Sequence, residues 1–234
     1  MISRLSACGF AAASVLTLAA ADPAYAGKQW LDAGLYTQYQ MAPDGSSISY
    51  VICGSVAQTE GCYGSGSLSP FEHACAVLEG KPKQKDNVIK RAVYVLDKRS
   101  SNSAPITLDV YTRTDTITDT YDTTVYTLKK QVSLGLNGGP NSHCSMAAND
   151  AFVYAATDVD TVAAGMNKAT YAVSQLGGFS PPANIVSITA DERGYIALHF
   201  NEGFYIYSPA GNLEGDGGGD ADMVGTRNAW VPKQ

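Results

Sequence analysis

The sequence predicts an all-β protein, and three observations support this. Seven segments after residue 90 are rich in Val, Ile, Thr and Tyr, the residue types that favour strands. Clusters of Gly, Pro, Asn and Asp separate them, as expected of turns between antiparallel strands. The chain also has 14 tyrosines, which suit half-buried sheets better than helices. The expected strands are 91–99, 106–114, 123–136, 151–158, 169–176, 194–200 and 203–209.

The first 26 residues have the pattern of a secretory signal peptide. Arg4 precedes an apolar run of Ala, Val and Leu, and "ADPAYA" ends that run with an Ala-x-Ala cleavage pattern. The run is much shorter than the ~20 residues of a helix that spans a membrane. We therefore expect cleavage after Ala26, a single all-β domain over residues 27–234, no transmembrane anchor, and a secreted or periplasmic location.

The balance of charge limits the class of partner. The net charge is −6, whereas nucleic acid and anionic membranes attract clustered Lys and Arg. We therefore expect no nucleic-acid partner. One cationic cluster, "KPKQKDNVIKR" at 81–91, lies beside a polar turn. A solvated loop is the favoured interpretation of this cluster, and a site for a polyanion is the alternative.

The cysteines agree with export. Cys8 leaves with the signal peptide, and the four that remain are an even number in an oxidising compartment. Three pairings are possible. We favour Cys53 with Cys62 and Cys75 with Cys144, because "CGSVAQTEGC" has two glycines and a polar middle that suit a hairpin loop closed by a disulfide.

One pattern recurs along the chain: an apolar residue, a small residue, a turn with Asp or Asn, and then a strand. Copies start at Met41, Met146 and Ile188, and a degraded copy starts at Leu68, so that consecutive starts are 27, 78 and 42 residues apart. A β-propeller blade needs about 40 to 45 residues. The pattern therefore resembles the blade repeats of exported bacterial β-propellers, although no signature marks a specific family.

The resemblance implies a small β-propeller-like repeat fold of four or five blades. Closure of such a ring by the two chain ends would bring Trp30 and Trp230 into one blade. The alternative is an antiparallel β-sandwich with long loops, which the same strand signals permit.

The acidic segment "NLEGDGGGDADM" (212–223) is the main candidate metal site. An EF-hand calcium loop needs oxygen ligands at fixed spacing and a glutamate at its last position, where this chain has Met223. Asp222, one residue earlier, could serve instead. The candidate ligands are Asn212, Glu214, Asp216, Asp220 and Asp222. A flexible surface loop is the favoured interpretation of this segment, and a calcium site is the alternative, so calcium is the one cofactor that the sequence suggests.

Other carboxylates have simpler interpretations. Asp119 and Asp122 lie in "DTYD", where we expect them to cap a hairpin, and Asp115 precedes them on a strand. Asp191 and Glu192 lie in "TADERGY". The recurring pattern has its turn at this position, so we expect an ordinary hairpin turn there. These carboxylates therefore predict turns more than an acid and base pair.

Two histidines lie near cysteines, in "FEHAC" (His73, Cys75) and "SHC" (His143, Cys144). Imidazole and thiolate both suit zinc. Adjacent residues on a strand point to opposite sides, however, and cysteines in an oxidising compartment form disulfides. The disulfides are the favoured interpretation. Glu72 beside His73 is a further candidate acid or base pair.

The segment "GFYIYSP" (203–209) alternates so that Phe204 and Ile206 face one side and Tyr205 and Tyr207 face the other. If the first pair enters the core, the two tyrosines form an aromatic surface that contacts sugars or proteins. The alternative is that both faces of this strand are buried.

These observations lead to one expected function and two alternatives. The sequence has no Gly-x-Ser-x-Gly, His-Glu-x-x-His or phosphate-loop motif, so no catalytic residues are assigned. We expect an exported, non-enzymatic β module that binds a glycan, an envelope component or a partner protein. The alternatives are a propeller-type hydrolase or lyase, with calcium near its site, and a structural protein of the envelope or matrix.

Overall fold

The computed structural model describes residues 36–56, 59–100, 104–117, 121–160, 162–176, 185–200 and 203–217. Every regular element in these ranges is a β-strand. The all-β prediction is therefore confirmed, and no membrane-spanning helix occurs in this part of the chain.

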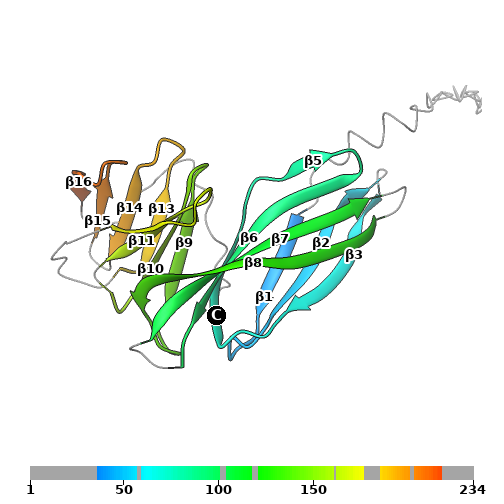
Figure 1. The fold of residues 1–234 in the computed structure, drawn as a ribbon, viewed down its shortest axis with the longest axis horizontal. Coiled ribbons are helices and arrows are strands. Elements are labelled where there is room, and N and C mark those ends of the chain that lie inside the picture. The colour runs from blue at the N-terminus through cyan, green and yellow to red at the C-terminus, as the bar shows by residue number, and fades with distance from the viewer. Residues whose placement is uncertain are drawn as a thin grey trace, which may run out of the picture.

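The strands form four antiparallel sheets, which follow one another along the chain (Figure 1). Sheet 1 contains β1 (Tyr36–Met41), β2 (Ile48–Val56) and β3 (Thr59–Leu68). Sheet 2 contains β4 (His73–Glu79), β5 (Lys83–Lys85), β6 (Val88–Lys98), β7 (Pro105–Ile117) and β8 (Tyr121–Asn137). Sheet 3 contains β9 (Cys144–Ala148), β10 (Phe152–Thr157), β11 (Ala163–Asn167) and β12 (Val173–Leu176). Sheet 4 contains β13 (Ser187–Ala190), β14 (Ile196–Phe200), β15 (Gly203–Tyr207) and β16 (Leu213–Gly217).

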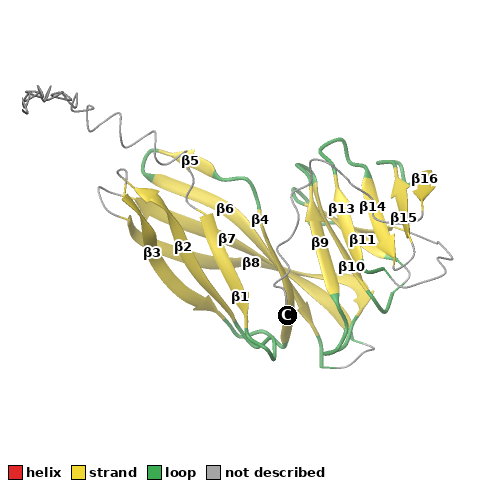
Figure 2. Cartoon of the chain, turned by 180° about the vertical axis from the view of Figure 1, so that it is seen from behind, coloured by secondary structure: helices red, strands yellow, loops and turns green. Residues whose placement is uncertain are grey.

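The four sheets pack face to face, because sheets 2 and 3 each bury side chains on both faces. In β6, Tyr94 lies in the core between sheets 2 and 3, whereas the preceding Val93 lies in the core between sheets 1 and 2. In β9, Met146 faces sheet 2 and the next residue, Ala147, faces sheet 4. Successive side chains of a strand point to opposite faces, so one run of apolar residues serves two cores. Sheets 1 and 4 lie at opposite ends of the stack (Figures 1 and 2).

The first strands of sheets 2, 3 and 4 lie next to one another. The Ile188 amide of β13 donates a hydrogen bond to the Ser145 hydroxyl of β9, at 3.1 Å. The Cys75–Cys144 disulfide joins the beginnings of β4 and β9. The three strands therefore start at one end of the molecule, and the turns that follow them gather at the other end.

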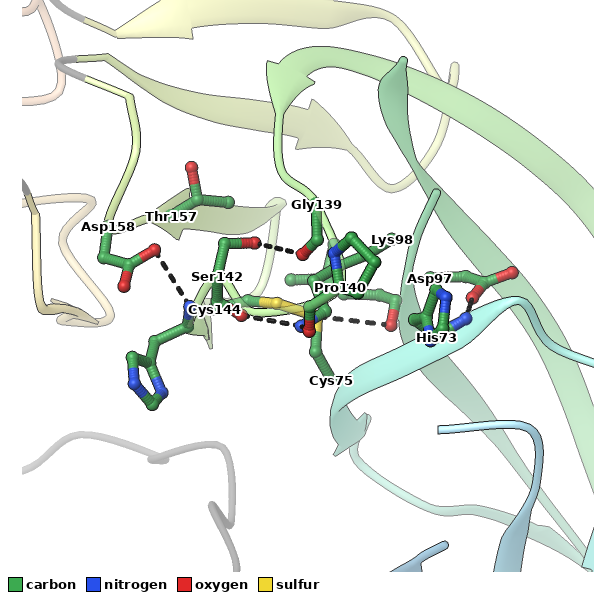
Figure 3. Close-up of a disulfide and its surroundings, with 12 residues drawn as sticks. His73, Cys75, Asp97, Lys98, Gly139, Pro140, Ser142, Cys144, Thr157 and Asp158 are labelled. Atoms are coloured by element: carbon green, nitrogen blue, oxygen red, sulfur yellow. Dashed lines mark hydrogen bonds between the residues drawn. A yellow bond between two sulfur atoms is a disulfide. The ribbon is translucent and has the colours of Figure 1, made fainter. Parts of the chain in front are cut away.

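Both predicted disulfides are confirmed. Cys53–Cys62 joins β2 to β3 within sheet 1, and Cys75–Cys144 joins sheet 2 to sheet 3. Beside the second disulfide, the buried Lys98 ammonium donates hydrogen bonds to the carbonyl oxygens of Pro140 and Ser142 (Figure 3). The disulfide and this lysine together hold the chain between sheets 2 and 3. Two disulfides are compatible with a secreted or periplasmic protein.

Each of the seven expected strands overlaps a strand of the structure, but the layers differ from the expectation. Four stacked sheets replace the two-sheet sandwich that the sequence allowed. The recurring turns after Met41, Met146 and Ile188 each join the first two strands of sheets 1, 3 and 4. The predicted cleavage site after Ala26 and the pairing of Trp30 with Trp230 lie outside the described residues.

The two disulfides should contribute unequally to stability. Cys75–Cys144 closes a separation of 69 residues and Cys53–Cys62 one of 9. The chain-entropy model gives about 4 kcal/mol for the first and about 2.5 kcal/mol for the second. We expect Cys75→Ala with Cys144→Ala to lower the free energy of unfolding in urea more than Cys53→Ala with Cys62→Ala. Equal losses would contradict this ranking.

Candidate functional site

A cleft of about 560 Å³ lies where the turns after the first strands of sheets 2, 3 and 4 gather. Sheet 2 contributes most of it, including a floor formed by Leu78, Ala92, Tyr94 and Thr112. Sheet 3 contributes two turns, and sheet 4 contributes Glu192. Four lysines line it, Lys81, Lys83, Lys90 and Lys168, together with Arg91, whose side chain is nearly buried in an ion pair with Glu79.

Lys81 ties the three sheets together at this end. Its ammonium lies 2.5 Å from the Asp150 carboxylate of sheet 3 and 3.2 Å from the Glu192 carboxylate of sheet 4. These hydrogen bonds raise the pKa of Lys81. The turn residue Asp191 accepts hydrogen bonds from the backbone amides of Arg193 and Tyr195, and this places Glu192 at the cleft. One lysine therefore pairs with both of these acidic groups and balances one of their two negative charges.

Lys83 and Lys90 lie directly opposite each other in the β5–β6 ladder. A two-residue turn, in which Asp86 has a φ of 53°, closes this hairpin and sets the register. Both side chains are exposed, and neither forms an ion pair with a carboxylate of the described chain. Like charges directly opposite on neighbouring strands repel each other and destabilise the hairpin. This pair is therefore unneutralised positive charge at the entrance of the cleft.

Lys168 supplies a further cation from the turn between β11 and β12. Its ammonium donates a hydrogen bond to the Asn149 carbonyl oxygen and lies 5.7 Å from the centre of the Tyr94 ring. Asn149 holds its own turn through hydrogen bonds from the amides of Ala151 and Phe152 to its side-chain oxygen. The position of Lys168 is therefore fixed by sheet 3 as well as by sheet 2.

Behind the cleft, a charged network is buried between sheets 1 and 2. Glu79 accepts hydrogen bonds from Arg91 at 2.9 Å and from Arg113 at 2.7 Å. Arg113 is 0% exposed and also donates to Asp115 at 2.8 Å. From sheet 1, the Tyr39 hydroxyl donates to Glu79 at 2.6 Å, and Thr37 accepts a hydrogen bond from Arg113. Two guanidinium groups and two carboxylates therefore compensate each other where the sheets meet.

The network fixes the protonation of its members. Burial by itself would raise the pKa of Glu79, but Arg91 and Arg113 outweigh burial and hold this pKa below its ordinary value. Burial, followed by the charge of Glu79, raises the pKa of Tyr39. Burial likewise raises the pKa of Tyr126, whose hydroxyl lies 3.1 Å from that of Tyr39, to about 12. At neutral pH, Glu79 is therefore ionised and both tyrosines are neutral.

A second hollow, of about 840 Å³, lies at the opposite end of the first strands and contains His73 and His143. His73 lies two residues before Cys75 and His143 directly before Cys144, and Figure 3 shows His73 near the disulfide that joins these cysteines. Nδ1 of His73 lies 2.9 Å from the carbonyl oxygen of Asp44, so Nδ1 carries the proton. The cysteines are disulfide-bonded, and no group of three metal-binding side chains occurs in the described ranges. The zinc hypothesis is therefore wrong for this set of residues.

The acidic segment is partly strand, contrary to the loop that its composition favours. Residues 213–217 form β16, which pairs with β15, and Asp216 lies opposite Tyr205. Glu214 and Asp216 are exposed, as is Asn212. Asp220 and Asp222 lie outside the described residues. Calcium binding at this segment stays a prediction, and a rise in melting temperature with calcium would test it.

The two tyrosines of β15 point into the molecule. Tyr207 is 3% exposed in the core between sheets 3 and 4, and the half-buried Tyr205 packs against the same core. Phe204 and Ile206 face the other side of sheet 4 and are half-buried. The two tyrosines therefore face the core and do not form the outward aromatic surface that the sequence allowed. A binding role for them stays a prediction.

The cleft was not found from the sequence as a site. The cationic segment 81–91 is the one usable signal, and its interpretation as a loop is wrong, because most of it forms the β5–β6 hairpin. Asp150 and Glu192 lay in recognised turns, but Lys168 had no signal. Arg113 and Asp115 lie two residues apart on a strand, so their side chains share one face. Solvent-exposed strands have the same spacing of charges, and the sequence therefore does not show that this pair is buried.

In comparisons with known proteins, no family model, curated protein or solved structure matches this chain.

Glu79→Gln should test the buried network. The pKa of Glu79 lies below its ordinary value of 4.5 in the folded protein. Its contribution to stability is therefore complete above pH 4.5 and is lost as the pH falls through the folded-state pKa. We expect Glu79→Gln to lower the free energy of unfolding by about 3 kcal/mol at neutral pH, because two buried guanidinium groups lose a partner. It should also flatten the acid side of the stability profile.

The control is Glu72→Gln, which removes the same charge from an exposed pair with Arg99 at 2.8 Å. Exposed pairs contribute little to stability, so its urea midpoint at neutral pH should change far less. Similar losses in both variants would show that the network does not stabilise the junction of sheets 1 and 2.

Proposed function

We propose that this protein is an exported binding module whose cleft takes an acidic glycan. The observation that carries the proposal is the unneutralised pair Lys83 and Lys90 at the entrance of the cleft. Lys168 adds positive charge from the opposite wall. In a protein of net charge −6, a local cationic cleft favours an anionic ligand, because a ligand carboxylate or sulfate relieves the repulsion between the lysines.

The ionic state of the cleft supports binding over catalysis. Its three carboxylates are held in ion pairs: Glu79 by Arg91 and Arg113, and Asp150 and Glu192 by Lys81. A general acid at neutral pH needs a raised pKa, whereas that of Glu79 is lowered. The arrangement therefore lacks the separated acid and base that a glycan hydrolase uses.

We further propose that sheets 2, 3 and 4 are blades of a propeller-like arrangement. Each is a meander whose first strand adjoins the first strand of the next sheet. The similar turns after Met146 and Ile188 support a shared repeat. In such an arrangement the blades surround a central axis, and the cleft lies at one end of this axis, where the loops of several blades meet.

Lys83→Ala and Lys90→Ala should each weaken binding of an acidic polysaccharide. Polygalacturonate is a suitable probe, with binding measured by calorimetry at low and at physiological salt. We expect each variant to raise Kd roughly fivefold at low salt, because an exposed charge pair contributes up to about 1 kcal/mol. The difference should shrink as salt screens the charges.

Lys129→Ala is the matched control, because Lys129 is exposed on β8 and does not line the cleft. It removes the same charge and should leave Kd within error of the unaltered protein. If Lys129→Ala weakens binding as much as Lys90→Ala, the attraction arises from overall charge and the cleft is not the site.

A further inference from the structure

The strands of sheet 2 are longer than those of sheet 3, so part of the face of sheet 2 that packs on sheet 3 extends past the edge of sheet 3. β6, β7 and β8 have 11, 13 and 17 residues, whereas the strands of sheet 3 have four to six. Figure 1 shows the far halves of β6–β8 in front of sheet 1, with sheet 3 to one side of them. Figure 2, from behind, shows sheet 1 against their other face. Within the described residues, sheet 1 covers one face of this half of sheet 2 and no other sheet covers the opposite face.

The strand register shows which side chains occupy the uncovered face. Rows cross the sheet from β6 through β7 to β8; they are Ala92, Thr112, Thr127; then Lys90, Thr114, Val125; and then Val88, Thr116, Thr123. On β5, Lys83 extends the second row and Lys85 the third. Ala92 and Thr112 line the cleft, so the uncovered face continues directly from it. We call these side chains the open face.

The charged side chains that the structure describes on the open face are all cationic. Lys83, Lys85 and Lys90 are exposed along one side of it. The acidic side chain nearest in sequence on β7 is Asp115, which is 0% exposed and points into the network toward sheet 1. The rest of the face consists of threonine hydroxyl groups and small apolar groups. Its chemistry therefore combines positive charge with hydroxyl groups that donate and accept hydrogen bonds.

We infer that the ligand of the cleft is a linear acidic polysaccharide, whose chain continues from the cleft along the open face. The inference rests on the proposed function, since the cleft supplies the first contact. Rows lie about 7 Å apart and the four strands span about 14 Å, which gives an extended chain room to lie on the sheet. Carboxylate or sulfate groups of the chain pair with the lysines, and its hydroxyl groups bond to the threonines.

The composition of the face favours a polysaccharide over other polymers. Protein interfaces depend on large anchors such as Trp, Tyr and Arg, and the open face has none among its described side chains. Single-stranded nucleic acid stacks its bases on aromatic rings, which this face also lacks. Hydroxyl and ammonium groups on a flat surface match a ligand that carries acid and hydroxyl groups along its length.

The test is the dependence of affinity on chain length. Calorimetry would compare the disaccharide, tetrasaccharide and octasaccharide of galacturonate with those of chondroitin sulfate, so that carboxylate and sulfate ligands are distinguished. We expect the octasaccharide of the preferred series to bind at least about tenfold more tightly than its disaccharide. If the disaccharide binds tightly and longer chains bind no more tightly, the ligand does not extend along the open face, and the cleft alone is the binding site. If no acidic oligosaccharide of any length binds, the proposed function itself is wrong.

Val125→Asp provides the matched variant. Val125 is 56% exposed in the middle row, so the substitution adds a negative charge to the open face without disturbing a core. We expect it to weaken the octasaccharide about tenfold and to leave the disaccharide unchanged. The control is Leu128→Asp, because Leu128 is 46% exposed and lies opposite Tyr111, whose side chain faces sheet 1. Equal weakening by both variants would show that the polysaccharide does not follow the open face.

Discussion

The burial of side chains on both faces of sheets 2 and 3 determines the rest of the structure. A strand presents alternate side chains to opposite faces, so a strand that is apolar on both faces needs a cover on each side. Val93 and Tyr94 meet this requirement with two different sheets. Sheets 1 and 4 complete the stack. The turns after β4, β9 and β13 then gather at one end, and the cleft lies among them.

The unequal lengths of the strands connect the fold to the proposed function. Sheet 3 is too short to cover the whole of sheet 2, and sheet 1 covers one face of what remains. On the covered face, Arg91 and Arg113 are compensated by Glu79 and Asp115 in a buried network. On the uncovered face, Lys83 and Lys90 have solvent in place of carboxylates. Strand β6 therefore carries Arg91, which is compensated by Glu79, on one side and Lys90, opposite Lys83 of β5, on the other.

Much of the fold was predictable from local patterns. β-branched residues and tyrosines located the long strands, and the spacing of Gly and polar residues supported the Cys53–Cys62 pair that left Cys75 and Cys144 as partners. The cleft was not predictable, because Lys81, Asp150 and Glu192 come from three different sheets. Their convergence depends on how the sheets stack. No local spacing in the sequence encodes the distance between two turns that are 42 residues apart.

The sequence by itself determined the all-β class and the strands rich in β-branched residues and tyrosines, since these depend on residue type and local pattern. It also favoured the observed disulfides, because the short spacing of Cys53 and Cys62 left Cys75 and Cys144 as the second pair. The tertiary structure decided the number of layers and the direction of the β15 tyrosines, because alternation defines two faces without stating which one meets a neighbour. It also decided the meaning of segment 81–91. As a sequence this segment is a run of cations, and only the β5–β6 register and the reach of sheet 3 place its lysines on one uncovered face beside a cleft.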